Sequence, residues 1–221
     1  MAEKTTFTFS GGKSYSPKNY NDRYAEGPLS MEAAIAYSDN IYAVKTHLFL
    51  GENNLINTAK RLGITSNLSE VPSLALGTSE ISLIEMTSAY SCFASLGYKT
   101  TPHFIKKIED SKGNILYENK EEKEHVFSTQ NVALINYMLQ SAVNNGTGRA
   151  ARVYYGKGQV AVGGKTGTTN ESRSVWFAGF TPDTVTTIYI GYDDNKPMKS
   201  SATGGGSVAP IFGKYYNNMI A

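Results

Sequence analysis

Three consecutive extended segments near the C-terminus constrain the fold of this chain more than any other feature. They are residues 159–163 running into Lys165, residues 174–181 and residues 184–192. The turn from Thr181 to Thr184, which contains Pro182 and Asp183, is short enough to make the last two segments antiparallel neighbours. An amphipathic helix over 208–219 follows them, and helical patterns precede them. This order predicts an α+β fold with an antiparallel sheet flanked by helices.

Capping residues mark the helices that precede this sheet. Ser82 and Glu85 form a capping box, which predicts a helix from there to about residue 96. Ser30 and Ser128 are placed to cap helices over 31–37 and from 129 to about 145. Further apolar patterns predict helices over 41–50 and 54–62, and a β-hairpin formed by 104–109 and 114–118. We interpret residues 1–28 as a loop-rich lead-in and residues 29–221 as one packed unit.

Composition excludes several classes of function. The formal charge is +2 in 221 residues, which is far from the basic character of a nucleic-acid-binding domain. A single cysteine and three histidines without ligand spacing argue against disulfides and a metal site. The sequence contains no run of eighteen apolar residues that would predict a membrane span. We therefore expect no metal, no cofactor and no nucleic acid.

The first stretch whose side chains could bind a substrate or take part in catalysis is Lys165-Thr166-Gly167-Thr168. A lysine supplies positive charge, two threonines supply hydroxyls, and Gly167 lets another backbone approach closely. Together they suit a peptide carboxylate lying along a strand edge, although an ordinary strand-to-turn segment would look similar. The preceding glycines resemble the end of a phosphate-binding loop, but Gln159 occupies the position where that motif needs glycine, and a strand follows instead of a helix.

Ser38-Asp39-Asn40 is the second such stretch. By itself it is best explained as the N-cap of the helix over 41–50, because Ser, Asp and Asn all cap well. Together with Lys165-Thr166-Gly167 it acquires another meaning. S-D-N and K-T-G are two of the three signature elements of class A β-lactamases and penicillin-binding proteins.

The chain resembles the transpeptidase domain of class A (bifunctional) penicillin-binding proteins, which cross-link bacterial peptidoglycan. Beyond the two triplets, the similarity runs in order over residues 15–193. It includes Tyr15–Tyr20, Leu29–Lys45, Pro72–Gly77, Glu80–Gly97, Asn145–Gly148, Gly164–Thr169 and Trp176–Gly179. The resemblance implies a serine β-lactamase/penicillin-binding-protein transpeptidase-like fold, of which residues 29–221 would be the C-terminal portion.

The resemblance also implies a serine acyl-transfer site without a cofactor. Ser38 would relay protons, Asn40 would hold the acyl side chain, and Lys165 would poise the proton network and attract the substrate carboxylate. Thr166, Gly167 and Thr168 would bind that carboxylate and the substrate backbone. The implied partners are peptidoglycan stem peptides and β-lactam antibiotics, on the extracytoplasmic face of a bacterial membrane.

The third signature element, a nucleophile in an S-x-x-K motif, is the weak point. The only such pattern is Ser10-Gly11-Gly12-Lys13, in a flexible stretch and too close to Ser38 in sequence. We therefore expect an N-terminally truncated domain that is inactive alone. Its partner would be the missing N-terminal part of the same enzyme, and an exposed truncated face could favour homo-oligomers.

Two other functions stay open at this point. A β-lactamase-like hydrolase would need a water-activating glutamate between the two triplets, where Glu80 and Glu85 lie, although Glu85 is better explained by the capping box. A non-catalytic module could grip cell-wall peptides through the Lys165 strand alone. Lys165-dependent stabilisation by a peptide ending in D-Ala-D-Ala would support the binding module, and a covalent penicillin adduct would indicate an enzyme.

Overall fold

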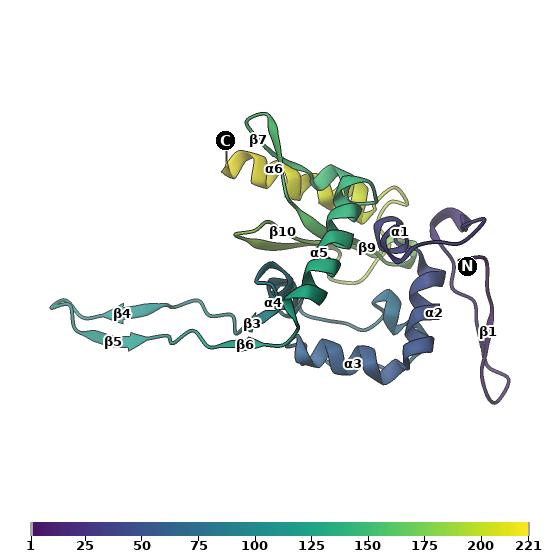
Figure 1. Ribbon diagram of the computed structural model, residues 1–221, viewed down its shortest axis with the longest axis horizontal. Helices are drawn as coiled ribbons and strands as arrows, with labels where there is room; N and C mark the ends of the chain where they lie inside the picture. The colour runs from purple at the N-terminus through teal and green to yellow at the C-terminus, as the bar shows by residue number, and fades with distance from the viewer. Residues whose placement is uncertain (1, 221) are drawn as a thin grey trace.

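The central sheet is antiparallel, as predicted. The structure is a computed structural model that describes residues 2–220 (Figure 1). Strands β9 (Gly163–Thr168), β10 (Ser174–Phe180) and β11 (Val185–Gly191) form a sheet in the order β11-β10-β9. Both neighbouring pairs are antiparallel, and Phe177 of β10 lies between Thr166 and Ile188.

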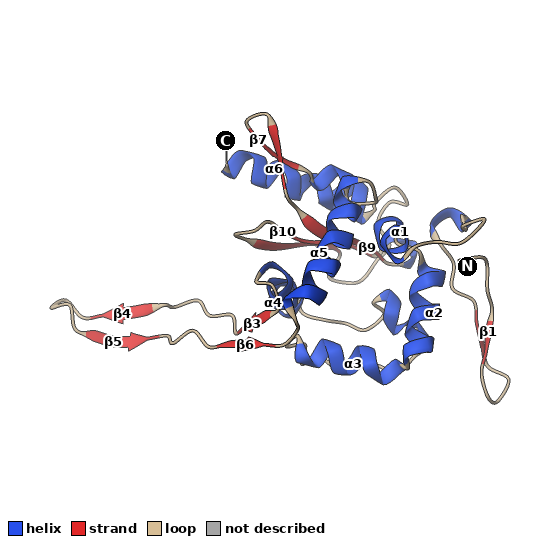
Figure 2. Ribbon diagram, in the orientation of Figure 1, coloured by secondary structure: helices blue, strands red, loops and turns tan. Residues whose placement is uncertain are grey.

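Helices cover both faces of this sheet (Figure 2). Phe177 packs edge-on against Phe212 of helix α6 (Ala209–Met219), with ring centroids 4.9 Å apart. Phe180 lies 6.5 Å from Tyr90 of helix α4 (Leu83–Ala94). Because side chains alternate along a strand, residues three apart point to opposite faces. The two contacts therefore place α6 on one face and α4 on the other, which confirms the α+β class.

The remaining helices lie where the sequence predicts, except that the one predicted over 54–62 begins at Glu52 and has no side-chain cap. They are α1 (Met31–Tyr37), α2 (Asn40–Leu50), α3 (Glu52–Arg61) and α5 (Thr129–Asn144). Ser30 accepts the Ala33 N–H, Ser128 accepts the Asn131 N–H, and Ser82 forms the complete capping box with Glu85. Helix α5 packs against both α1 and β9, so it joins the N-terminal helices to the sheet.

The predicted segment 159–165 is two strands rather than one. Strand β8 (Gly158–Val160) forms a hairpin with β7 (Val153–Tyr155), which the sequence did not predict, and β9 begins only at Gly163. The alternation of apolar residues continues across residues 161 and 162, so the sequence pattern does not reveal that β8 ends before β9 begins. Gly163 and Gly164 are required by packing, because a Cβ on either would lie 2.6 Å from a phenylalanine ring of β10.

Two hairpins extend from this core. Near the N-terminus, β1 (Phe7–Thr8) pairs with β2 (Ser14–Tyr15), followed by a short 3-10 helix over Tyr20–Asp22. The predicted hairpin at 104–118 is the tip of a long arm (Figure 1). The base of the arm is β3 (Tyr98–Thr100) paired with β6 (Lys123–His125), and its tip is β4 (Lys107–Glu109) paired with β5 (Ile115–Glu118).

Short irregular helices complete the fold, and the main core lies between the sheet and α6. The short helices are η2 (Pro72–Leu76), η3 (Arg149–Ala151), η4 (Asn170–Ser172) and a π-helical turn, η5 (Gly204–Val208). Core members include Val175, Phe177, Val208, Phe212 and Tyr216. Within residues 2–220, no helix is long and apolar enough to cross a membrane.

Candidate functional site

Lys165, Thr166, Gly167 and Thr168 all lie within β9, at the edge of the central sheet. This strand pairs only with β10, so within the described chain its other edge has no strand partner. Lys165 and Gly167 alternate with Thr166 and Thr168 along the strand. The stretch is therefore part of the sheet, with a free edge that an extended peptide could join.

Ser38 meets Lys165 across 127 residues of sequence. The Lys165 ammonium donates a hydrogen bond of 2.7 Å to the Ser38 hydroxyl and a weaker one of 3.2 Å to the Thr166 carbonyl. Ser38 lies between α1 and α2 in the left-handed conformation, with φ 60° and ψ 51°. This conformation is costly for a residue other than glycine, so a packed surrounding must hold it. The two triplets thus form one cluster.

Burial makes Lys165 a weaker base than an ordinary lysine. Desolvation lowers the pKa of its ammonium from 10.5 to about 8. Within residues 2–220 no carboxylate forms an ion pair with it, so nothing offsets the effect of burial. A lysine with a pKa near 8 can exchange a proton with a neighbouring hydroxyl close to neutral pH, which suits general acid–base chemistry.

Asp39 and Asn40 position the Ser38 turn. The Asp39 carboxylate caps α2 by accepting the Tyr42 N–H at 2.7 Å, so the capping interpretation of the triplet is correct for this residue. Asn40 does not hydrogen-bond to Ser38 or Lys165; its side-chain amide donates to the Lys18 carbonyl at 2.7 Å.

Asn19 is a positioning residue that sequence reasoning missed. Its side-chain amide donates to Asp39 at 2.7 Å, and its side-chain oxygen accepts the Asn40 N–H at 2.8 Å. Both contacts reach back from the lead-in to the start of α2, so this one side chain ties residues 1–28 to the Ser38 turn. The sequence did offer one indication of this role, because Asn19 lies in the Tyr15–Tyr20 stretch that resembles the family.

The loop over 145–148 is a second missed contributor. The Thr147 hydroxyl lies 2.7 Å from the Thr166 hydroxyl, and the Thr147 N–H donates to the Ala36 carbonyl of α1 at 3.0 Å. A Cβ on Gly146 would lie 2.0 Å from the Ala36 carbonyl oxygen, so glycine is needed for this close approach. The loop therefore fixes α1, and with it Ser38, relative to β9.

A neighbouring backbone already lies close to Gly167. A Cβ added to Gly204 of η5 would lie 2.6 Å from the Gly167 carbonyl oxygen, and the Gly204 N–H donates to the Thr168 hydroxyl at 3.0 Å. The close approach that the sequence suggested for a substrate is thus made, on this side of β9, by the chain itself. Thr168 keeps an exposed side chain at the end of the strand.

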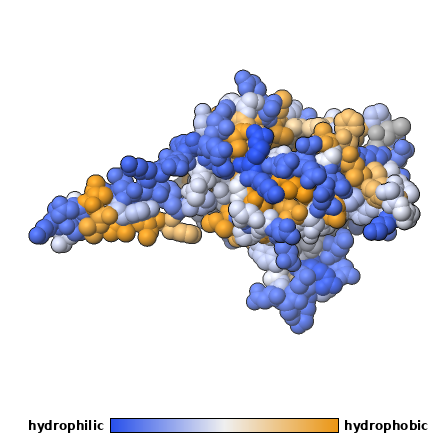
Figure 3. Space-filling view, turned by 90° about the horizontal axis from the view of Figure 1, so that it is seen from below, coloured by the Kyte–Doolittle hydropathy of each residue, from blue (hydrophilic) through white to orange (hydrophobic). Residues whose placement is uncertain are grey.

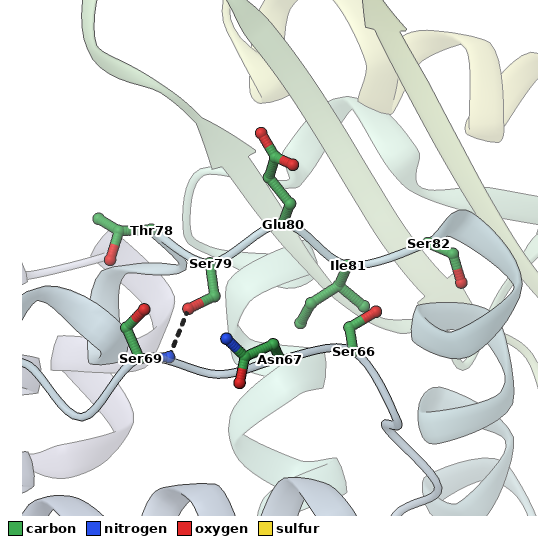
Figure 4. A pocket seen from close by; sticks show the side chains of 8 residues that line it. All are labelled: Ser66, Asn67, Ser69, Thr78, Ser79, Glu80, Ile81 and Ser82. Carbon is green, nitrogen blue, oxygen red and sulfur yellow. Dashed lines mark hydrogen bonds between the residues drawn. The ribbon is translucent and has the colours of Figure 1, made fainter.

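Glu80 lines a separate hollow formed by residues 66–82 (Figure 4), and Glu85 hydrogen-bonds to Ser66 and Ser82 of its lining. Its lining includes Ser66, Asn67, Ser79 and Glu80, and none of the residues of the Ser38–Lys165 cluster. Glu85 accepts six hydrogen bonds from N–H and O–H groups of Thr65, Ser66 and Ser82. These bonds hold the pKa of its carboxyl far below the ordinary value, so it is a poor base and a good structural anchor.

Ser10 and Lys13 occupy the turn of the β1–β2 hairpin. Gly11 and Gly12 both have positive φ, and the Gly12 N–H donates to the Phe9 carbonyl to close the turn. Ser10 is exposed, and the Lys13 carbonyl accepts a hydrogen bond from the Phe9 N–H across the hairpin. Figure 1 shows this hairpin pointing away from β9. In the described residues no group of three or more His, Cys, Asp or Glu side chains could hold a metal ion.

The chain is similar in sequence and in structure to known penicillin-binding proteins. The chain is 40% identical to penicillin-binding protein 2D of Bacillus subtilis over 90% of its length, and 36% identical to penicillin-binding protein 1A of Aquifex aeolicus over 97%. It spans 29% of the length of each relative. The crystal structure of penicillin-binding protein 1A from Haemophilus influenzae superposes with a TM-score of 0.85 at 26% identity, covering 99% of this chain and 38% of that one. The model of the penicillin-binding protein transpeptidase domain matches residues 2–217, and the chain therefore belongs to that family.

Proposed function

We propose that this chain carries the proton-relay and carboxylate-binding half of a peptidoglycan D,D-transpeptidase site. The observation that carries the proposal is the hydrogen bond between the Lys165 ammonium and the Ser38 hydroxyl beside the free edge of β9. A stem peptide would lie along that edge as an added strand. Its terminal carboxylate would be held by Lys165 and by the hydroxyls of Thr166 and Thr168.

The acyl transfer would proceed by attack of a serine hydroxyl on the penultimate D-alanyl carbonyl. Ser38 would pass a proton to the leaving D-alanine nitrogen. Lys165, whose pKa is about 8 and whose ammonium donates to the Ser38 hydroxyl, would then give Ser38 a proton in its place. Asn40 would orient the acyl side chain, for which its side-chain oxygen is available. A β-lactam would occupy the same cleft as a mimic of the D-Ala-D-Ala end.

The attacking serine is not among the residues of this cluster. Ser10, the one candidate by pattern, lies in the turn of the β1–β2 hairpin, which points away from β9 (Figure 1). We therefore propose that the chain by itself forms no acyl intermediate, and that the nucleophile is supplied by a segment preceding residue 1 in the parent enzyme. That enzyme would act on the extracytoplasmic face of a bacterial membrane.

A fluorescent penicillin followed by intact mass measurement tests this proposal. We expect no covalent adduct on the 221-residue chain, and labelling of a chain extended toward the N-terminus. Labelling of the extended chain should be lost in the Lys165→Ala variant and retained in a Lys157→Ala control, because Lys157 is an exposed lysine in the β7–β8 turn. An adduct on Ser10 would overturn the proposal.

A hydrolase of the β-lactamase type is the less favoured enzyme. Glu85 is committed to six hydrogen bonds, and Glu80 is exposed beside a hollow that excludes the Ser38–Lys165 cluster. If the labelled adduct on the extended chain hydrolysed rapidly, and if this depended on Glu80, the hydrolase would replace the transpeptidase. Lys165-dependent stabilisation of the short chain by a D-Ala-D-Ala peptide, without labelling of the extended chain, would favour the non-catalytic binding module.

A further inference from the structure

The tip of the projecting arm has no partner within the described chain. Strands β4 and β5 form an isolated two-stranded ribbon, and every one of their residues is exposed. Phe104 is 94% exposed and Leu116 is 67% exposed. Figure 3 shows apolar residues along the arm, away from the body of the molecule. Isolated two-stranded ribbons are marginally stable in water, so pairing with further strands would stabilise this one.

The outer edge of β4 is ready to form hydrogen bonds. The Asn119 N–H donates to the Lys106 carbonyl, and the Asp110 N–H donates to the Asn114 carbonyl, so Lys106 and Asp110, which flank β4, and with them Ile108, direct their main-chain groups toward β5. In an antiparallel ladder the residues between them point their N–H and C=O groups the other way. The main-chain groups of Lys107 and Glu109 are therefore directed outward. The register shifts beside Ile108 because β5 contains one extra residue, Leu116, which has no partner in β4. Strand β4 itself therefore stays regular.

The charged residues along this edge would meet residues of opposite charge if two copies of the strand paired about a two-fold axis. If two β4 strands pair antiparallel about Ile108, Lys107 of each copy faces Glu109 of the other. These are the residues whose main-chain groups point outward, so the hydrogen-bonded pairs and the charge pairs coincide. Lys107 and Glu109 already form an ion pair of 2.5 Å within one chain. In the pair of copies, each charge would lie between two opposite charges.

We infer that β4 is a self-association edge whose occupant is a second copy of this chain. Two arms would join into one antiparallel sheet in the order β5-β4-β4-β5, with a two-fold axis through the facing Ile108 residues. Ile108 and its cross-strand neighbour Tyr117 lie on one face of the ribbon, so the pairing would make one continuous apolar face from the two copies. This surface is distinct from the edge of the central sheet.

The other edge of the arm lacks this complementarity. Strand β5 reads Ile-Leu-Tyr-Glu, with a single charge, so antiparallel self-pairing brings no opposite charges together. An association through β5 would therefore have no register that charge pairing favours. Pairing is therefore assigned to the β4 edge alone, and it is independent of the proposed acyl-transfer function.

Cysteine cross-linking tests the register directly. In the proposed pair, the Ile108 residues form a non-hydrogen-bonded pair, whose Cα atoms lie about 4.5 Å apart, within the range that a disulfide spans. The native Cys92 is fully buried and does not interfere. With oxidised glutathione as the oxidant, the Ile108→Cys variant of the full chain should form a disulfide-linked dimer. The Phe104→Cys variant, more exposed but outside the register, should do so at least about tenfold more slowly.

Charge exchange tests the pairing without any covalent bond. In sedimentation equilibrium, Lys107→Glu and Glu109→Lys should each weaken dimerisation by at least about tenfold, because each places like charges face to face. The double variant K107E/E109K restores opposite charges in every pair and should recover the wild-type constant. Lys112→Glu in the hairpin turn is the matched control and should change nothing.

Three results would overturn the inference. They are a wild-type chain that stays monomeric up to millimolar concentration, equal cross-linking rates at Ile108 and Phe104, and a double variant as weak as the single ones. Circular dichroism of each variant checks that the body of the molecule is folded. All of these substitutions lie on the exposed arm, where the packing of the central sheet is not involved.

Discussion

Replacing Lys165 by methionine should remove a pH-dependent penalty on folding. Burial lowers the pKa of the ammonium from 10.5 to about 8, so the folded protein holds this proton less tightly than the unfolded chain. Between those two pH values the unfolded state binds more protons. The free energy of unfolding of the wild type should therefore rise with pH across this window, relative to the Lys165→Met variant.

The size of this rise follows from the shift. One pKa unit corresponds to about 1.4 kcal/mol, so a fully buried ammonium with this shift would be destabilised by about 3 kcal/mol at neutral pH. The Lys165 side chain is partly accessible and its ammonium is hydrogen-bonded to Ser38. Solvent screening reduces the expected value to about 1–2 kcal/mol. Well above pH 10.5, where both states have lost most of the proton, the difference in slope should vanish.

Urea unfolding at a series of pH values, for wild type and Lys165→Met, measures this difference. Tyrosines titrate over part of the same range in both proteins, and subtraction removes their contribution. The Lys157→Met variant, which changes an exposed lysine, should parallel the wild type. A titration of the Lys165 ε-carbon by NMR with a midpoint near 10.5, or parallel stability curves for wild type and Lys165→Met, would refute the reasoning.

Three further substitutions test the framework around the site. Ser38→Gly should be about 1 kcal/mol more stable than Ser38→Ala, because only glycine adopts the left-handed conformation without cost; equal thermal unfolding would contradict this. Gly146→Ala should cost about 2–4 kcal/mol, because its Cβ would lie 2.0 Å from a carbonyl oxygen of α1, whereas Gly27→Ala, with nothing within 4 Å, should be nearly neutral in denaturant melts. Glu85→Gln should cost about 2 kcal/mol at neutral pH, and Glu80→Gln almost nothing. Since the pKa of Glu85 is lowered, its contribution is present above the ordinary value of 4.5 and should disappear as the pH falls below it; a pH-independent loss would exclude this explanation.

Most of the local structure could be predicted from the sequence. The N-caps at Ser30, Ser82 and Ser128 were correct because a cap satisfies N–H groups only two or three residues away. The turn at 181–184 was correct for the same reason, since its geometry depends on neighbouring residues. The family could also be identified from the order of short motifs along the chain.

The missed elements depend on contacts between residues far apart in sequence. Strand β7 is defined by pairing with β8, and its own three residues carry no pattern long enough to detect. Thr147 acts on the site only because α1 and β9 lie on either side of its loop. Asn19 likewise has a role only once the lead-in is folded against α2.

The sequence by itself determined which groups this protein can use: an ammonium, hydroxyls and an amide in two recognisable triplets. Only the tertiary structure decided that the Lys165 ammonium reaches the Ser38 hydroxyl, that burial weakens it as a base, and that Asn40 turns toward Lys18 instead. The physical reason is that hydrogen bonds over a few residues are set by local backbone geometry. The distance between two side chains 127 residues apart, and the water left around them, are set by how the whole chain packs.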